Sequence, residues 1–129
     1  MTEQTKHLID DVMTIGVPVS DQDRALAFYR DTLGFRTVRD VSLPQVGGRW
    51  IEVAPPSGSV TIALVPARPG VPAGVETGIR FTAADAGTVH TELRSRGVEV
   101  GEILRWPGVP AMFAFRDQDG NGHEIVEAA

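Results

Sequence analysis

Apolar and polar residues alternate along residues 12–19, "VMTIGVPV". One set of alternate positions is apolar and comprises Met13, Ile15, Val17 and Val19, and the other comprises Thr14, Gly16 and Pro18. Because successive side chains of a strand point to opposite faces, this pattern predicts a strand buried on one face. Pro18 cannot donate to a sheet ladder and favours a strand end or a sheet edge.

The next segment, "SDQDRALAFYRDTLGF", has the spacing of an amphipathic helix. Ser20 and Asp23 have the spacing of a capping box, and Gly34 provides a stop. Its predicted buried stripe consists of Ala25, Phe28, Tyr29 and Leu33. Three strands are predicted to follow, at residues 35–41, 49–54 and 60–66.

After a connector rich in proline and glycine, residues 67–74, the same order of elements begins again. Thr82 and Asp85 repeat the capping box between a strand, "TGIRFT", and a second helix. The inward positions of this helix are Ala86, Val89 and Leu93, and the strands predicted after it are residues 98–104, 111–116 and 122–127. We therefore predict one α+β domain over residues 1–129, built from two tandem βαβββ units at 8–66 and 75–129.

The last hairpin, "FRDQDGNGHEIVE", contains half of a calcium-loop pattern. The matching residues are Asp117, Asp119, Asn121 and Gly122. A calcium loop also needs a bidentate Glu at its last position, which here is Ala128, and helices on both sides. The flanking segments are typical of strands, so we predict a type I′-like hairpin turn at residues 119–122.

Composition excludes several classes of function. The formal net charge is −5, and the basic residues other than Lys6 are arginines scattered singly, which argues against a nucleic-acid surface. The chain has no cysteine, which rules out disulfides and thiolate metal sites. It has no apolar run of about 18 residues, so we expect no membrane span. Its first residues lack the pattern of a signal peptide, and a cytoplasmic location is expected.

Two stretches, "VPVSDQDRALAFYRDTLGF" and "FAFRDQDGNGHEIVE", resemble the vicinal-oxygen-chelate superfamily, which comprises glyoxalases, bleomycin resistance proteins and extradiol dioxygenases. With the repeat, the resemblance covers essentially the whole chain. It implies curved mixed sheets that form a central cup, and a homodimer, often with units exchanged between subunits. Uncovered sheet edges are compatible with a dimer. The resemblance does not choose between lyases, epimerases, thiol transferases, dioxygenases and metal-free drug-binding proteins.

The resemblance also implies where metal ligands would lie. The four positions fall on Thr14, Ala63, Gly78 and Glu124, and only Glu124 keeps a competent side chain. A divalent ion needs about two or three nitrogen or oxygen side-chain donors. We therefore expect the metal site to be degenerate and no cofactor to be needed.

The three histidines do not replace the missing ligands. His7 lies in the N-terminal segment, and His90 lies on the second helix, where a structural role is expected. His123 is next to Glu124 but points to the opposite sheet face by period two. A rearranged metal site at His123 and Glu124 is the alternative.

Residues expected to point into the cup are candidates for ligand binding. Arg80 and Glu124 are predicted to meet across the cup, either as a structural ion pair or as a pair that orients a polar ligand. Trp50 and Glu52 point away from Ile51 and Val53 in their strand and join the candidates.

Trp106 precedes the last hairpin, and with Trp50 it would clamp a flat apolar ligand, with Met112 adding to the wall. The alternative for each tryptophan is packing at a dimer interface or over a sheet edge. Phe28, Phe81 and Phe115 are assigned to the core between helices and sheets.

Two functions follow from these residues. The first is a metal-independent protein that binds and sequesters a small molecule, an antibiotic or an aromatic metabolite. The second is a divergent lyase, isomerase or dioxygenase-related enzyme that uses either a divalent metal or Glu124 as a general base. We favour binding, because only one of the four metal positions retains a ligand.

Overall fold

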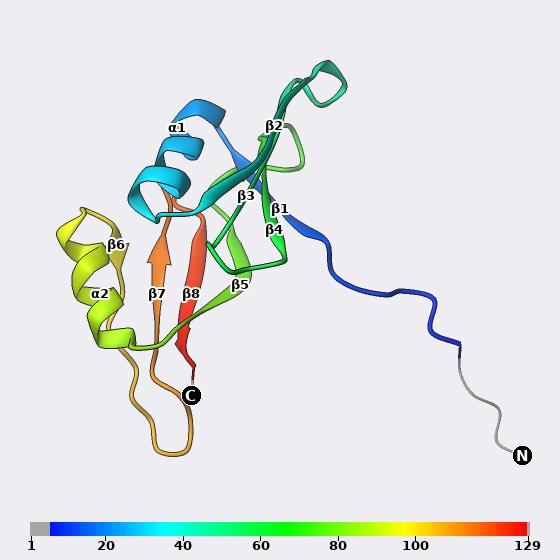
Figure 1. Cartoon of the computed structure of the whole chain (residues 1–129). Coiled ribbons are helices and arrows are strands. Elements are labelled where there is room, and N and C mark those ends of the chain that lie inside the picture. Colours follow the sequence, from blue (N-terminus) through cyan, green and yellow to red (C-terminus); the bar gives the residue numbers. More distant parts are fainter. Residues whose placement is uncertain (1–5, 129) are drawn as a thin grey trace, which may run out of the picture.

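Each half of the chain forms a four-stranded mixed sheet with one helix in the computed structural model, which describes residues 6–128 (Figure 1). The elements of the first half are β1 (Thr14–Val19), α1 (Gln22–Ala27), η1 (Phe28–Thr32), β2 (Arg36–Leu43), η2 (Pro44–Val46), β3 (Gly48–Ala54) and β4 (Thr61–Pro66). Those of the second half are β5 (Glu76–Ala83), α2 (Ala86–Ser95), β6 (Glu99–Val100), β7 (Met112–Arg116) and β8 (Gly122–Glu127). Among the helices within residues 6–128, none has the length and hydrophobicity of a membrane span.

The two sheets have the same topology, which confirms the predicted fold. The strand orders are β1-β4-β3-β2 and β5-β8-β7-β6, and in each sheet the first and last strands of the unit, β1 with β4 and β5 with β8, run parallel. The sixth strand is the main departure, because it covers only Glu99–Val100 instead of residues 98–104. Beyond it the chain keeps an isolated bridge of Leu104 with Met112 and then leaves the sheet as a loop containing Pro107 and Pro110, which have no N–H group for a ladder.

Both helices are capped by an aspartate and not by the hydroxyl residues that the sequence predicted. Asp21 Oδ1 accepts from the backbone N–H of Arg24, and Asp85 Oδ1 accepts from that of Thr88. The hydroxyl of Ser20 instead donates to Asp119 of the last hairpin. The predicted Ser20 and Thr82 caps were therefore wrong, because a carboxylate at the true N-cap position satisfies the free helix donors equally well.

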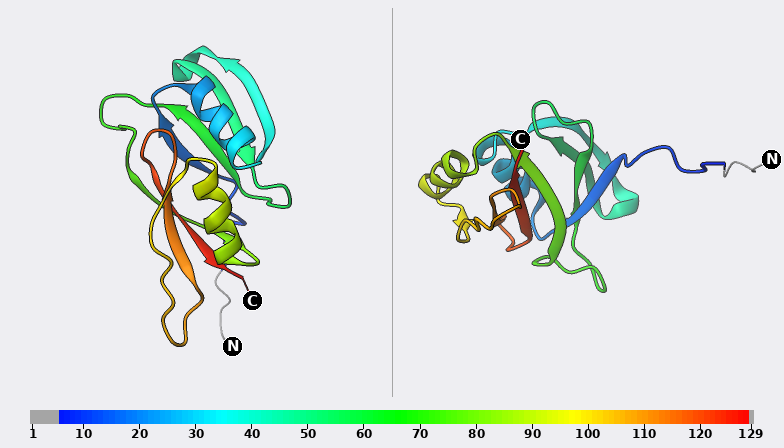
Figure 2. Two further views of the ribbon diagram at one scale, coloured as in Figure 1. Left: turned by 90° about the vertical axis from the view of Figure 1, so that its left-hand side faces the viewer. Right: turned by 90° about the horizontal axis from the view of Figure 1, so that it is seen from below.

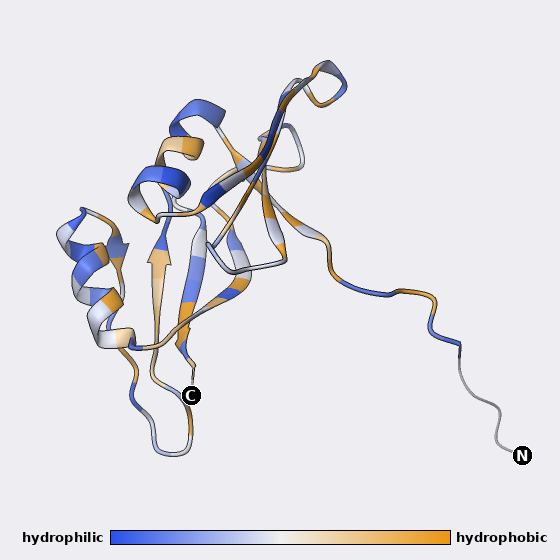
Figure 3. Ribbon diagram, in the orientation of Figure 1, coloured by the Kyte–Doolittle hydropathy of each residue, from blue (hydrophilic) through white to orange (hydrophobic). Residues whose placement is uncertain are grey.

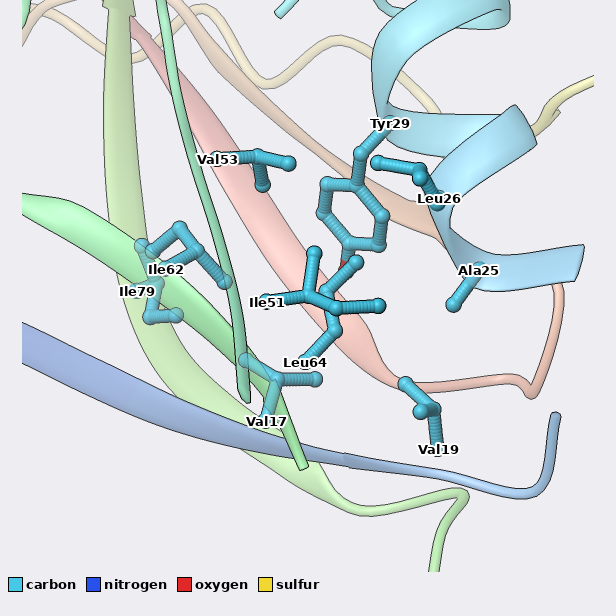
Figure 4. Close-up of a cluster of buried hydrophobic side chains, with 10 residues drawn as sticks. All are labelled: Val17, Val19, Ala25, Leu26, Tyr29, Ile51, Val53, Ile62, Leu64 and Ile79. Atoms are coloured by element: carbon cyan, nitrogen blue, oxygen red, sulfur yellow. The ribbon is translucent and has the colours of Figure 1, made fainter. Parts of the chain in front are cut away.

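Alternate strand residues and the helices form two apolar clusters that meet. The first cluster contains Tyr29 and the core-facing residues of β1, β3 and β4 (Figure 4). The second lies between α2 and the second sheet and includes Phe113 and Phe115. Phe28, Leu33 and Phe81 pack against both, which confirms the core assignment of Phe28, Phe81 and Phe115. Met13 departs from the predicted alternation, because it precedes β1 and is exposed.

The last hairpin turn does not have the type I′ geometry that was predicted. Gly120 N donates to Asp117 O, and Gly120 has a φ of +80°. A type I′ turn needs positive φ at both central residues, and no residue other than glycine has positive φ within residues 6–128. The turn is instead a type I turn followed by one left-handed glycine, which is the common three-residue hairpin loop.

The side chains of this turn form hydrogen bonds with other groups of the protein. The buried Asp117 accepts from the backbone N–H groups of Asp119 and Asn121 through Oδ1. The fully buried Asn121 amide donates to Pro18 O in β1 and accepts from the N–H groups of Gly74 and Val75. Asn121 thus joins the first strand, the connector and the last hairpin, and strands instead of helices flank the turn.

A buried polar chain also joins the two halves through His123, whose side chain points into the core as predicted. Tyr29 Oη donates to Asp117 Oδ2 at 2.7 Å and lies 2.7 Å from His123 Nε2. The other ring nitrogen lies 2.8 Å from Thr77 Oγ1. Thr77 Oγ1 also donates to Gly122 O at 2.7 Å, so the polar chain runs from Asp117 through Tyr29 and His123 to Thr77 and the last strand. Burial lowers the pKa of His123 to about 4, against the opposing charges of Asp117 and Glu76.

Acidification is expected to destabilise the fold through His123. The folded protein has a His123 pKa of about 4, against 6.5 for an ordinary imidazole, so the unfolded chain binds more protons. The stability from this group is therefore complete above pH 6.5 and is lost as the pH falls towards 4. The full loss is about 3 kcal/mol. Urea unfolding from pH 7 to pH 4.5 measures it.

The control is His123→Gln, which removes the titrating ring and keeps a polar side chain. Carboxylate protonation acts on both proteins, so the difference between their pH profiles isolates His123. The same loss of stability in both proteins over this pH range would contradict the assignment.

Candidate functional site

The face of the first sheet opposite the core carries the first group of candidate residues. Ile51, Val53 and their neighbours pack in the apolar cluster, so the alternate positions point to the other face. We call this the first-sheet face, defined by Thr14, Gly16, Pro18, Trp50, Glu52, Ala54, Thr61, Ala63 and Val65. Trp50 and Glu52 thus lie on the face that the sequence predicted.

Glu52 is held in place by two hydrogen bonds on this face. Trp50 Nε1 donates to Glu52 Oε2 at 2.6 Å, and Thr61 Oγ1 donates to Glu52 Oε1 at 2.7 Å. The Thr61 bond and then the Trp50 bond lower the pKa of Glu52 below its usual value. The carboxylate therefore stays ionised, and it retains lone pairs that can accept from a ligand.

A cavity of about 540 Å³ opens beside Trp50. Its walls include Gly16, Pro18, Val65 and the indole of Trp50, and Arg68 contributes the charged group. Four of the lining residues were not predicted from the sequence as site residues: Gly16, Pro18, Val65 and Arg68. The alternation along β1 and β4 was a usable signal for three of them, because it places them on the same face as Trp50.

The cavity exists because β3 and β4 separate next to Trp50. Their paired residues are Glu52 with Ala63 and Val53 with Ile62. Beyond this pairing, the side chain of Gln22 bridges the two strands, with Nε2 donating to Arg49 O at 2.6 Å and to Leu64 O at 2.8 Å. Gln22 Oε1 also accepts from Arg49 N at 3.0 Å. The side-chain amide of Gln22 thus takes the place of backbone hydrogen bonds between β3 and β4 and keeps Trp50 and Val65 apart.

Arg80, Glu124 and Met112 form a second group, on the corresponding face of the second sheet. Arg80 Nε lies 3.2 Å from Glu124 Oε1, and Arg80 Nη2 lies 3.6 Å from Met112 Sδ. The predicted pairing of Arg80 with Glu124 is therefore present, and it joins register partners on the adjacent strands β5 and β8. Both side chains are about half exposed, which leaves them accessible to a ligand or to another chain.

Gly78 lies at an irregularity in β5. The register of β5 against β8 shifts between Glu76 and Arg80, and Gly78 has a φ of +73°. A residue with a Cβ atom is strained at such an angle. The position that the family resemblance assigned to a metal ligand is therefore a glycine bulge.

The family resemblance places metal ligands at four positions, and the residues present there do not fit a metal ion. Thr14 Oγ1 donates to Thr61 O, Glu124 is paired with Arg80, and Ala63 and Gly78 have no donor atom. Across residues 6–128, no three histidine, aspartate or glutamate side chains are grouped so that they could hold an ion. One hydroxyl and one paired carboxylate are fewer donors than a protein site for a divalent ion needs.

Trp106 lies apart from Trp50, so one chain does not form the predicted tryptophan clamp. Trp106 is 59% exposed and borders a different cavity with Arg105 and Pro110. Its loop, residues 101–111, extends from the end of the molecule opposite the β2–β3 hairpin (Figures 1 and 2).

The remaining histidines make local contacts. His90 Nε2 lies 2.9 Å from Gly101 O, and its ring packs edge-on against Phe113, which agrees with a structural role. The exposed His7 lies 3.6 Å from Asp10.

Replacing Gly78 by alanine is expected to destabilise the fold, whereas Gly16→Ala is not. At both positions an added Cβ meets nothing within 4 Å, but only Gly78 has a positive φ. Gly78→Ala should lower the free energy of unfolding by about 1 to 2 kcal/mol. Gly16→Ala should leave it unchanged or raise it by about 0.5 kcal/mol. Urea unfolding of both variants measures the difference, and equal losses would contradict the strained bulge.

Comparison with known proteins gives the family. The sequence profile of the Glyoxalase/Bleomycin resistance protein/Dioxygenase superfamily matches residues 9–125. The solved structure of TnmS3, an antibiotic binding protein from Streptomyces sp. CB03234, is 32% identical, with a TM-score of 0.83 over 96% of this chain and 100% of that chain.

A superfamily member from Sphaerobacter thermophilus DSM 20745 is 31% identical, with a TM-score of 0.84 over 95% of this chain and 100% of that chain. The uncharacterized protein YetH of Bacillus subtilis (strain 168) is 28% identical over 119 residues, which are 88% of this chain and 95% of YetH. The chain belongs to the Glyoxalase/Bleomycin resistance protein/Dioxygenase superfamily.

Proposed function

We propose that this protein binds and sequesters a small molecule, an antibiotic or an aromatic metabolite, without transforming it. The observation that carries the proposal is the cavity lined by Trp50, whose indole N–H also donates to the carboxylate of Glu52. A largely apolar cavity with a few fixed polar groups is the usual form of a small-molecule site. Similarity to TnmS3, an antibiotic binding protein, supports the same function.

The ligand packs against the indole of Trp50 in this proposal. Pro18 and Val65 form the rest of the apolar wall, and Gly16 leaves open space above β1. An aromatic ring gains from contact with the indole face as well as from the removal of apolar area from water. Glu52 accepts a hydrogen bond from a ligand donor group and so orients the bound molecule.

Binding needs no metal ion in this account. Support comes from the chemistry of Thr14, Ala63, Gly78 and Glu124, and from the bulge at Gly78. The enzyme alternative with Glu124 as general base has less support, because Glu124 is already paired with Arg80. Turnover of a bound ligand would favour that alternative.

We also propose that the working form is a homodimer. One chain leaves the side chains of Arg80 and Glu124 about half exposed on the second sheet. A second copy provides a surface that can cover this group. The two-fold symmetry of most dimers would then give two equivalent sites.

Ligand binding is expected to quench the fluorescence of Trp50. A panel of planar antibiotics and aromatic metabolites is titrated into the protein, and quenching is compared with that in Trp50→Phe and Trp106→Phe. Trp50→Phe should remove most of the quenching and weaken binding by about tenfold. Trp106→Phe is the matched control and should retain the Trp50 signal.

A second variant fills the cavity without removing its aromatic wall. Gly16→Leu adds a side chain into open space, because φ of Gly16 is not positive and no atom lies within 4 Å of an added Cβ. It should weaken binding by about tenfold or more at unchanged folding stability. Tight binding by Gly16→Leu and Trp50→Phe alike would place the ligand elsewhere and contradict the proposed site.

A further inference from the structure

The cavity beside Trp50 contains one charged side chain, that of Arg68. None of the other residues that line it, all within residues 6–128, is acidic or basic, and most are apolar. A guanidinium is charged throughout the physiological pH range and presents a fork of N–H donors that matches a carboxylate. The lining therefore favours one kind of ligand over others.

Arg68 lies in a tight turn of the connector between β4 and β5. Its N–H group donates to Val71 O at 3.1 Å, and Val71 N donates to Arg68 O at 2.8 Å. Pro69 and Gly70 occupy the two central positions, and Gly70 has a φ of +84°, which is the pattern of a type II turn. The backbone of Arg68 is thus fixed before a ligand binds, which lowers the cost of ordering the site.

Within residues 6–128, the guanidinium of Arg68 has no carboxylate partner. The arginines that form ion pairs there are Arg30, Arg49, Arg80, Arg96 and Arg116. Arg68 is exposed and lines the cavity without such a pair. Its charge is therefore available to an anionic group of a ligand, and hydrogen bonds between charged groups are among the strong ones.

Three parts of the chain line the cavity, and they differ in polarity. The first-sheet face contributes the indole of Trp50 and its apolar neighbours. Gln45 and Val46 come from η2, at the tip of the β2–β3 hairpin, where hydrophobic and hydrophilic residues adjoin (Figure 3). The connector turn contributes Arg68. A flat ring fits the apolar wall, and an acid group on that ring fits the connector side.

The carboxylate of Glu52 is held at the other end of the first-sheet face. Thr61 Oγ1 binds it at the start of β4, whereas Arg68 follows the end of this strand at Pro66. A strand of this length spans about 17 Å. Charges in solvent are screened over about 8 Å at physiological ionic strength. An acid group of the ligand therefore lies at the Arg68 end, away from Glu52.

We propose that the ligand of this site is a planar aromatic acid, with its carboxylate bound by Arg68 and its ring against Trp50. This ligand class rests on the proposed function and narrows it. A carboxylate accepts two N–H bonds from a guanidinium, and the neutral amide of the same ring cannot form this charged pair. The formal net charge of −5 disfavours anions at long range, so the affinity for an acid depends on Arg68.

Matched pairs of probes test the ligand class. Naphthalene carboxylate and its amide, and anthracene carboxylate and its amide, are titrated by calorimetry into the parent protein, Arg68→Gln and Arg68→Lys. The parent should bind each acid about tenfold or more tightly than its amide, because of the charged hydrogen bonds. Arg68→Gln should remove this preference and leave the affinity for the amide unchanged. Arg68→Lys should keep part of the preference, because it keeps the charge without the fork.

Arg94→Gln is the matched control, because it removes one positive charge from an exposed position in the last turn of α2, outside the cavity. It should bind the acids as the parent does. A preference for acids that persists in Arg68→Gln, or that Arg94→Gln reduces equally, would overturn the assignment of Arg68.

The same titrations separate the ligand class from the proposed function. Equal affinities of the parent for acid and amide, both weakened by Gly16→Leu, would overturn the ligand class and leave the binding site in place. Binding of neither acid nor amide would also overturn the ligand class. In that case, quenching of Trp50 by other molecules would still support the proposed function.

Discussion

The buried amide of Asn121 fixes how the two halves of the chain lie against each other. It binds Pro18 of the first strand, the N–H groups of Gly74 and Val75 in the connector, and Asp117 of the last hairpin. The amide of Asn121 is itself fully buried, and a buried polar group without hydrogen-bond partners is costly. Tyr29 and His123 extend the same cross-link into the aromatic core. A turn that resembles a calcium loop in sequence thus provides the polar contacts that a tandem fold needs.

The two halves contact each other through the core-facing sides of their sheets. The opposite faces of the two sheets therefore can carry different side chains. The first-sheet face combines small residues, an indole and an oriented carboxylate beside a cavity. The second-sheet face has an exposed ion pair and a glycine bulge at Gly78. Both faces come from the same βαβββ plan, so the difference lies in side chains and in two local departures from regular pairing. These departures, the separation of β3 from β4 and the bulge in β5, determine what the faces can bind.

The sequence predicted the order of elements and the facing of most strand residues, because both depend on local periods. It placed Trp50 and Glu52 opposite the core and His123 inside it, and the structure agrees. Helix caps were less certain, because Ser20 and Asp21 are adjacent and both can accept from a helix N–H group. The turn type was missed, because a DGNG sequence fits more than one hairpin geometry and the buried bonds of Asn121 select between them.

The features that the sequence could not give are non-local. The bridge of Gln22 between β3 and β4 joins residues far apart in the chain, and no period indicates it. Likewise, the distance between Trp50 and Trp106 depends on how the two halves pack, which the sequence does not show. In the structure the two tryptophans of the predicted clamp line different cavities. The register shift at Gly78 does have a local signal, because a glycine within a strand often marks a bulge. A glycine is also found in regularly paired strands, so this signal alone does not predict the shift.

The central claim is that this member of the superfamily uses its first-sheet face without a metal ion. Elemental analysis of the purified protein, before and after incubation with Mn, Fe, Ni and Zn followed by desalting, tests it most directly. The account predicts clearly substoichiometric metal in every sample and no change on Glu124→Ala. About one tightly held ion per chain, lost on Glu124→Ala, would contradict it and would make a metal-dependent enzyme the better interpretation.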